Sequence, residues 1–445
     1  MGRLPIAVAR PSRSNVALFI ESTDMQRPSF IPAALPASLV LLATLAAPAA
    51  QAADDAARIA ALEARIAALE ARLAQVAEPA PAAAAVEAPP AAAPAIPVVD
   101  LAPLQAHAKA SAWAERVQVR GDLRVRHDSL DSTGEDARLR ERLRARLSVV
   151  AKLDEGFGAT LAVASGNDDP ISRNQTFDGG FNSKSINIEQ AFVSWKPDSV
   201  PGLEMLAGKF RLPVWVEGDA FLVFDSDVNP EGYHVAWRRP IGDLTFFASG
   251  SAWWVDERST SADTVLYGAQ AGVRIPAGEG GEFVATLSNN HYSNLDGRPA
   301  IYEATGRGNR LVGGRYATGY NIVEVGLDWK GSIGPAAAAL FGDWVRNTEA
   351  DRFDTGYAVG GTLAHHGITL GYFWKSLEAD AVLGVFADSD FGLGGTDVEG
   401  HQVSVEYDLN RAVNLRARWA SVEHGGNAGV TQDADRILLD VLVRY

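Results

Sequence analysis

The sequence predicts an all-β fold, a 16-stranded antiparallel transmembrane β-barrel preceded by a short α-helical coiled coil. From residue 113 onward, apolar and polar residues alternate with a period of two, which is typical of strands and not of helices. Sixteen such segments follow one another to the last residue. Short turns and longer loops alternate between them, as in a membrane barrel with an even number of strands.

The composition fits this class and excludes several others. The 445 residues include 0 cysteines, which excludes a disulfide framework, a Cys-ligated metal site and a thiol nucleophile. The formal net charge of -15 makes nucleic acid a poor partner. Beyond the N-terminal region no apolar run reaches the roughly 18 residues of a transmembrane helix. Alternating strands remain compatible with the sequence, because their hydropathy pattern is weak.

Residues 1–52 are predicted to be an upstream extension followed by a signal peptide. Residues 33–50 are apolar and small, Arg27 precedes them, and residues 50–52 fit the small-x-small cleavage rule. Met25 lies at the right distance to be the true start, because the residues before it are too polar and too punctuated by proline for a signal peptide. An N-terminal membrane anchor is the alternative, disfavoured by the prolines within the short apolar stretch.

Residues 53–77 are predicted to form a short coiled coil. Their apolar residues recur at alternating spacings of three and four, which is a strict heptad pattern. Arginines at g positions would meet glutamates at e positions of a parallel neighbour, which predicts self-association. A single amphipathic helix lying on a surface is the alternative. Residues 78–112, rich in alanine and proline, are predicted to be an extended linker.

Residues 113–445 are predicted to form the barrel itself. The final strand keeps its apolar phase as far as Tyr445, so it can pair with the first strand and close the barrel. A terminal aromatic residue also matches the signal that the outer-membrane assembly machinery reads. Aromatic residues near strand ends indicate girdles at two membrane interfaces, with core aromatics as the alternative. The predicted strands span residues 115–128, 137–153, 157–166, 184–196, 203–212, 232–240, 243–255, 264–276, 281–293, 319–330, 335–346, 354–365, 367–378, 399–409, 412–423 and 434–445.

Several stretches of the barrel region resemble the Gram-negative putative-porin family and, more loosely, the phosphate-selective porins. The stretches are VQVRGDLRVRHD, ARLRERLRARLSVVAKLDEGF, EQAFVSWKP, LEMLAGKFRLPVW and ILLDVLVRY, with the Ala-rich coiled coil before them. The resemblance covers roughly residues 113–445 and implies a sixteen-stranded, trimeric diffusion pore in the Gram-negative outer membrane. It implies contact with membrane lipid and lipopolysaccharide. It does not identify a solute, and no lysine cluster typical of phosphate-selective porins is present.

Arginines fill the polar phase of four predicted strands, the first two and the last two. Closure of the barrel places these strands side by side, so their inward residues form one basic wall. In a barrel of this size the lumen is water-filled, and its inward residues determine selectivity. Solvated wall residues without such a role are the alternative. The predicted wall consists of Arg120, Arg124, Arg126, Arg138, Arg140, Arg142, Arg144, Arg146, Arg416, Arg418, Arg436 and Arg444.

The loop after the fifth predicted strand, residues 213–231, is rich in acids. In sixteen-stranded porins this third long loop folds into the barrel, so the resemblance implies an eyelet in which these acids face the arginines. A transverse field in such an eyelet would orient polar solutes and narrow the pore. The predicted constriction-loop acids are Glu217, Asp219, Asp225 and Asp227. Other acids are expected in exposed loops, namely Asp380, Asp388, Asp390, Asp397 and Glu399.

No catalytic residue, metal site or cofactor is predicted. The sequence lacks a G-x-S-x-G elbow, and the Ala207–Phe210 stretch lacks the glycine spacing of a phosphate loop. His365 and His366 are adjacent at a predicted turn, where neighbouring strand residues would point to opposite faces. The acidic stretch at residues 167–169 has no fixed ligand spacing for Ca²⁺.

These observations favour a porin that lets small hydrophilic solutes and ions diffuse passively through a water-filled, arginine-lined and anion-favouring lumen. A solute-specific channel for an oligosaccharide or an anion is the nearest alternative. A barrel enzyme would need a Ser/His pair near a membrane interface, and no convincing pair is found. A structural or adhesive protein would need long repeats, which are absent from the sequence.

Overall fold

The structure is a computed structural model that describes residues 116–278 and 280–445. The predicted extension, signal peptide, coiled coil and linker (residues 1–112) lie outside the described residues. No helix within the described ranges is long and apolar enough to cross a membrane.

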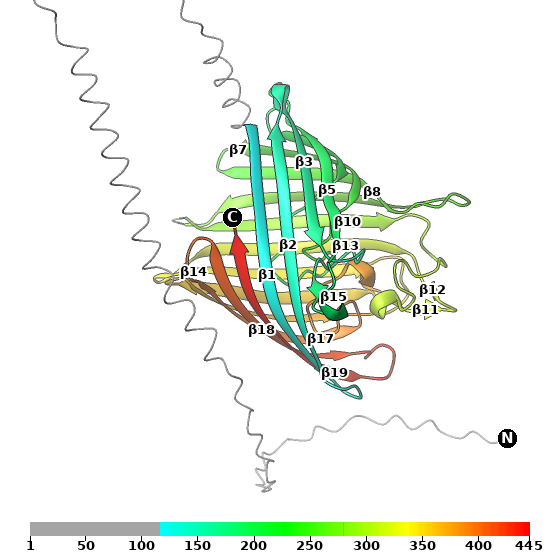
Figure 1. The fold of residues 1–445 in the computed structure, drawn as a ribbon. Coiled ribbons are helices and arrows are strands. Elements are labelled where there is room, and N and C mark those ends of the chain that lie inside the picture. Colours follow the sequence, from blue (N-terminus) through cyan, green and yellow to red (C-terminus); the bar gives the residue numbers. More distant parts are fainter. Residues whose placement is uncertain (1–115, 279) are drawn as a thin grey trace, which may run out of the picture. The chain divides into compact units, whose positions relative to one another are not determined.

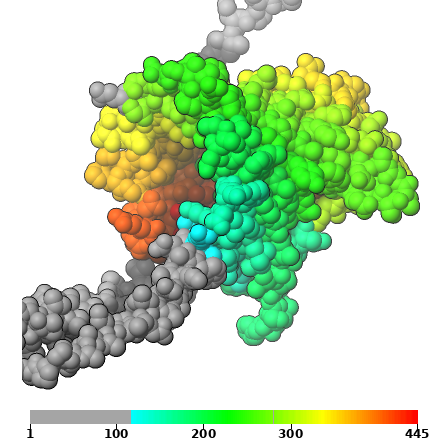
Figure 2. Space-filling model, turned by 90° about the horizontal axis from the view of Figure 1, so that it is seen from above, coloured from blue at the N-terminus to red at the C-terminus, as the bar shows by residue number. Residues whose placement is uncertain are grey.

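Sixteen antiparallel strands of the described residues form one closed barrel (Figure 1). Strands β1 (Val117–Ser132) and β19 (Gln432–Arg444) close it, because they pair along most of their length. Seen from above, the first strands (cyan) lie beside the last ones (red) (Figure 2). The other barrel strands are β2 (Arg138–Lys152), β3 (Phe157–Ser165), β5 (Ile186–Trp195), β6 (Leu203–Lys209), β7 (Glu231–Ile241), β8 (Leu244–Asp256), β9 (Thr264–Pro276), β10 (Glu282–Tyr292), β13 (Tyr320–Ile333), β14 (Ala336–Asn347), β15 (Thr355–His365), β16 (Ile368–Leu377), β17 (Val398–Asp408) and β18 (Val413–His424).

Each of the sixteen predicted strands is present, and the largest differences lie at three strand ends, one of which is the end of β13 at Ile333 instead of residue 330. The first strand continues to Ser132, because its pairing with β19 extends as far as Ser132 opposite Ala434. The fifth predicted strand ends earlier, at Lys209. The next residue, Phe210, donates its amide to Pro230 O at 3.0 Å, and the chain between these two residues leaves the wall.

Short turns join strands at one end of the barrel and long loops join them at the other, as predicted. The β15–β16 turn is an example of a short turn, because only His366 and Gly367 lie between the two strands. Both residues have positive φ (49° and 78°). Such a turn matches the twist of a tight hairpin. Because His366 lies in the turn and not in a strand, its ring lies 3.9 Å from that of His365, centroid to centroid, instead of on the opposite face.

The apolar phase of the strands faces outward. Val119, Val125 and Leu139 are 60%, 51% and 68% exposed, whereas Arg126 in the other phase is 0% exposed. An apolar exterior and a polar interior are typical of a transmembrane barrel. Aromatic residues that the pattern places on the outer face are also exposed, among them Tyr233, Trp344, Tyr407 and Trp419.

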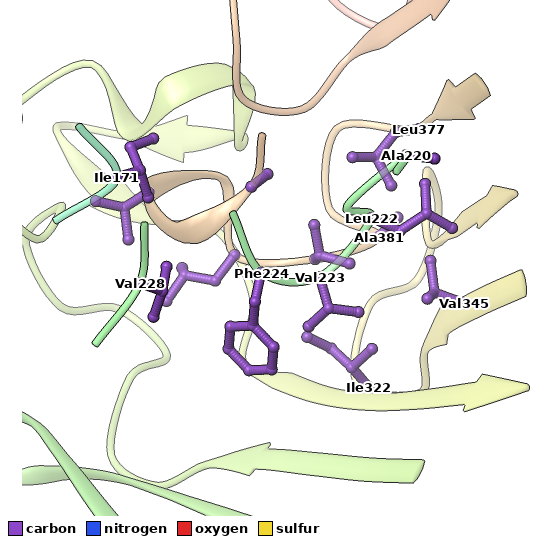
Figure 3. Packing of buried hydrophobic residues seen from close by; sticks show 14 of the residues in the cluster. Ile171, Ala220, Leu222, Val223, Phe224, Val228, Ile322, Val345, Leu377 and Ala381 are labelled. Carbon is purple, nitrogen blue, oxygen red and sulfur yellow. The ribbon is translucent and has the colours of Figure 1, made fainter. Parts of the chain in front are cut away.

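The apolar core lies where two loops pack against residues of the barrel wall (Figure 3). We name them the early loop, residues 210–230, and the late loop, residues 378–397. Leu222, Val223 and Phe224 of the early loop belong to one buried cluster with residues of the late loop and of the wall. Late-loop members include Ala381, Val382, Leu383, Val385 and Phe391, and wall members include Ile322, Val345 and Leu377.

Hydrogen bonds join the two loops to each other and to the barrel. The amide of Asp225 donates to Phe386 O at 2.7 Å, and the amide of Ser389 donates to Asp225 Oδ2 at 2.8 Å. Lys375 of β16 donates to Ala220 O at 3.0 Å. Backbone polar groups within an interior need such partners. Shorter strands lie in other loops, namely β4 (Gln175–Thr176), β11 (Leu311–Val312) and β12 (Arg315–Tyr316).

The late loop corrects one expectation. Its acids are not exposed, because the loop folds into the lumen instead of projecting into solvent. Asp380, Asp388 and Asp397 are 0%, 6% and 8% exposed, and the side chain of Asp390 is only 18% exposed. Glu399 is exposed as expected, but it is the second residue of β17 and does not lie in the loop. No periodicity in the sequence distinguishes an inserted loop from an external one.

Candidate functional site

The basic wall lies where the ends of the chain meet. Strands β18, β19, β1 and β2 are consecutive neighbours in the barrel. Their register places arginine opposite arginine, with Arg124 facing Arg144 and Arg126 facing Arg142. Like charges directly opposite each other destabilise a sheet. The wall therefore requires carboxylates, and the structure supplies them in two separate networks.

The first set of ion pairs, which we name the loop-end network, lies toward the long loops. Arg126 reaches Asp440 of β19 at 2.6 Å and Asp390 of the late loop at 2.8 Å. Arg436 reaches Asp128 of β1 at 3.0 Å, and Asp128 is fully buried. The network contains six arginines, Arg124, Arg126, Arg140, Arg142, Arg418 and Arg436, and three acids, Asp128, Asp390 and Asp440.

The second set, the turn-end network, lies nearer the short turns and is balanced in charge. Arg146 of β2 reaches Asp227 of the early loop and Glu189 of β5, both at 2.8 Å. Arg144 reaches Asp122 at 2.8 Å. Its three arginines are Arg144, Arg146 and Arg173, and its three acids are Asp122, Glu189 and Asp227.

Two acids of the inserted loops have opposite pKa shifts. Burial would raise the pKa of Asp390, but the charges of Arg126, Arg418 and Arg436 hold it well below the ordinary range. The pKa of Asp225 is raised well above its ordinary value, first by burial and then by the charges of neighbouring aspartates. Both acids lie in the same packed interior, so the presence or absence of arginine determines the direction of the shift.

The four predicted constriction-loop acids do not lie together. Asp227 contacts the basic wall. Asp225 accepts hydrogen bonds from the amides of Asp227 and Ser389, at 2.8 Å each, and pairs with no arginine among the described residues. Asp219 is exposed. Glu217 lies against strands β10, β13 and β14, because Thr286 of β10 donates to its carboxylate.

The twelve predicted wall arginines also divide into groups. Eight of them belong to the two networks. Arg416 pairs with Glu406 of β17 at 2.7 Å. Arg120, Arg138 and Arg444 are exposed and make no ion pair among the described residues. The wall thus has a paired interior and free arginines near its rims.

Sequence reasoning missed three acids at the basic wall. It also missed a group of buried acids on strands β13 and β14, across the barrel from the wall. Asp128 shares the phase of Arg124 and Arg126, so the alternation could have identified it. Asp390 lies in an aperiodic loop, and no local pattern marks it. Glu189 is likewise separated from its partner Arg146 along the chain. The acids on the other side are Glu324 and Asp328 of β13 and Asp343 of β14, all buried.

The structure has two large cavities, and one of them borders the loop-end network. One of about 830 Å³ is lined by Arg138, Arg140, Arg142, Arg436 and Asp390, together with other loop residues. The second, of about 740 Å³, is lined by residues 196–198 and 201–204 at the β5–β6 turn and by the start of the early loop, including Trp215. Arg274 lies over the Trp215 ring, 4.6 Å from its centroid, and so lines this cavity with a cation and an aromatic face.

Comparison with known proteins gives a family and a fold. A family model described as "Putative porin" matches residues 129–312 and 350–445. OprB of Pseudomonas putida, solved at high pH, has 12% identity and a TM-score of 0.51, over 77% of this chain and 97% of that one. OmpF of Salmonella typhi, in complex with daunomycin, has 12% identity and a TM-score of 0.47, over 74% and 97%. No curated protein matches. The OprB comparison supports the barrel fold alone.

Proposed function

Because the chain belongs to the putative porin family, a family of Gram-negative outer-membrane barrels, we propose that it is a passive channel for small hydrophilic solutes and ions that favours anions. The observation that carries this proposal is the composition of the loop-end network. Six guanidinium groups share three carboxylates there, so positive charge exceeds negative charge by three. Charged side chains that line a channel determine its ion selectivity.

The excess charge lies where a solute entering from the loop end would meet it. Arg138, Arg140, Arg142 and Arg436 line the cavity of about 830 Å³, and Arg138 has no ion-pair partner among the described residues. A cleft lined by one sign of charge concentrates ions of the opposite sign. The turn-end network adds no net charge, so the loop-end network dominates the field of the wall.

We also propose a transverse field, in a form that differs from the sequence hypothesis. Asp227 is the constriction-loop acid that faces the arginines, at 2.8 Å from Arg146. The positive pole is the basic wall, and the negative pole is the buried acid group of β13 and β14, seven or eight strands away from β2 around the barrel. A polar solute between the two regions would align its dipole with this field.

The test is the reversal potential of single channels in a planar bilayer under a KCl gradient. We expect wild type to prefer chloride. Arg140→Gln combined with Arg142→Gln should move the potential toward the cation side, because two of the six arginines are lost while Asp128 keeps Arg436 as a partner. The matched control is Arg120→Gln combined with Arg444→Gln, which removes the same charge from exposed positions. Cation preference in wild type, or equal shifts in both pairs, would contradict the proposal.

A solute-specific channel is the second candidate, and the inserted loops favour it. The early and late loops place an apolar cluster inside the barrel, which reduces the lumen beyond what one constriction loop would do. The cavity with Trp215, Phe247 and Arg274 offers both apolar and cationic surface to a solute. Flux into liposomes that saturates with solute concentration would favour this candidate, whereas linear flux would favour general diffusion.

We propose that the channel works as a homo-oligomer, a trimer, embedded in outer-membrane lipid and lipopolysaccharide. Its exposed apolar outer face, with residues such as Leu139 and Tyr233, supports burial in lipid and against other copies. The mass of the detergent-solubilised protein from light scattering distinguishes a trimer from a monomer.

A further inference from the structure

Three buried carboxylates meet where the early loop touches the barrel wall. Glu217 belongs to the early loop, Glu324 to β13 and Asp343 to β14. One carboxylate oxygen from each lies within 4.8 Å of those from the other two. Their residues are 1%, 7% and 5% exposed. This carboxylate cluster is separate from both arginine networks.

The wall is shaped to receive the loop carboxylate. Gly326 of β13 pairs with Asp343 on one side and with Thr286 on the other. A Cβ atom at Gly326 would lie 2.0 Å from Cδ of Glu217, so the Glu217 carboxylate occupies space that only a glycine leaves free. The Thr286 hydroxyl donates to Glu217 Oε1 and orients it. The position of Glu217 is thus determined by two neighbouring strands.

The cluster lacks the positive charge that its burial requires. No lysine or arginine nitrogen of the described residues lies within 4.0 Å of its carboxylates. Glu217 Oε2 and Asp343 Oδ1 are buried and accept no hydrogen bond. Isolated buried carboxylates are costly, and buried charges in proteins are paired or coordinate a metal. The two orphan oxygens are therefore free for a ligand that supplies positive charge.

We propose that Glu217, Glu324 and Asp343 bind one divalent cation of the Ca²⁺ class, which fastens the early loop to the barrel wall. The donor set consists of carboxylate oxygens, which suit hard cations and not soft metals. Oxygens bind Ca²⁺ at about 2.3–2.6 Å, so two ligands on opposite sides of the ion lie up to about 5 Å apart. The 4.8 Å limit on the oxygen separations meets this condition. Mg²⁺ binds at about 2.0–2.1 Å and keeps several waters, which fits three buried carboxylates less well.

The cation would complete a two-point attachment of the early loop. Asp227, near one end of the loop, is held by Arg146 at 2.8 Å. Glu217, near the other end, has only the Thr286 hydroxyl as a hydrogen-bond partner of its side chain among the described residues. Binding of Ca²⁺ at Glu217 fixes this second point without affecting the arginine networks.

The proposal is tested by equilibrium dialysis of the folded, detergent-solubilised full chain against ⁴⁵Ca²⁺ after treatment with EDTA. We expect one saturable site per chain. Glu217→Gln and Asp343→Asn should each weaken binding roughly 10–100-fold or abolish it, as the loss of groups that support a metal site does. The matched control is Asp219→Asn, an exposed acid two residues from Glu217 in the same loop. Its affinity should equal that of wild type.

Several outcomes would overturn the proposal. Absence of a saturable site in wild type would mean that protons and not a cation compensate the cluster, and this result does not depend on whether any variant folds. Equal binding by wild type, Glu217→Gln and Asp343→Asn would place the site elsewhere, for example on the exposed acidic loops. Heat-modifiable migration on gels confirms that each variant is folded before dialysis. Conductance plays no part in the readout, so the test is independent of the proposed channel activity.

Discussion

The basic wall and the carboxylate cluster are both buried, charged regions of one barrel, but they differ in how their charge is balanced. At the wall, Asp390 and Asp227 arrive from two loops and join acids of the strands to neutralise most of the arginines. At the cluster, the loop brings a third acid, Glu217, to two existing ones. The inserted loops thus bring acids to both regions. These acids find arginine partners at the wall, whereas at the cluster the positive charge must come from a cation in solution.

The largest effect is expected from removing Arg126, which is 0% exposed and bridges Asp390 to Asp440. Arg126→Leu removes two hydrogen bonds from each carboxylate, although Asp390 keeps Arg418 at 2.8 Å. Hydrogen bonds to charged groups contribute about 1.5–3 kcal/mol each, so we expect a loss of about 3–5 kcal/mol once the weaker repulsion among the remaining arginines is included. Urea unfolding in lipid vesicles measures the loss. Arg120→Leu, at an exposed arginine of the same strand, should change stability by about 0.5 kcal/mol or less. Equal losses in both variants would show that the network does not stabilise the barrel.

A smaller effect is expected at the seat of the carboxylate cluster. Gly326→Ala places a methyl group 2.0 Å from Glu217 Cδ, so the loop must shift, at a cost of about 1–3 kcal/mol. Gly342→Ala on the neighbouring strand is the matched control, because a Cβ there meets no atom within 4 Å. Proteolysis within the early loop of the folded barrel should be faster in Gly326→Ala alone. Unchanged proteolysis would mean that Glu217 does not hold the loop.

The two regions also differ in how far the sequence could predict them. The period-two alternation located the strands and the arginine phase, because side-chain direction in a strand depends on local sequence alone. Asp128 follows from the same alternation. The positions of Asp390 and Glu217 depend on how long loops fold inside the lumen, and the apolar contacts that determine this join residues far apart in the chain. Leu222 and Leu383, for instance, belong to one cluster but are far apart in sequence.

The composition of the loops gave a misleading expectation for the same reason. An acid in a Gly-rich, aperiodic segment is ordinarily solvated, and this holds for Asp219 but not for Asp380. Asp380 is buried because Arg310, the Tyr320 hydroxyl and the Arg310 amide all bond to it. None of these partners adjoins it in the sequence, so only the folded loops reveal its environment.

The pH dependence of stability at Asp225 and Asp390 is the prediction that best separates the two kinds of charge balance. The folded-state pKa of Asp390 is depressed by its arginines, so its stabilising contribution is present above the unfolded pKa and is lost only as the pH falls below that value. The folded-state pKa of Asp225 is raised by burial, so its contribution is present below the unfolded pKa and is lost as the pH rises through the raised value. Asp225→Asn removes this ionisable group and keeps one of the two oxygens, so it retains one of the two hydrogen bonds that the amides of Asp227 and Ser389 donate. Unfolding in urea at a series of pH values should therefore show the variant gaining stability relative to wild type as the pH rises.

Asp390→Asn should change the stability in the opposite direction. It should be less stable than wild type, and this loss of stability should shrink only in strong acid. The same sign for both variants would mean that arginine contact does not determine how the inserted loops respond to pH.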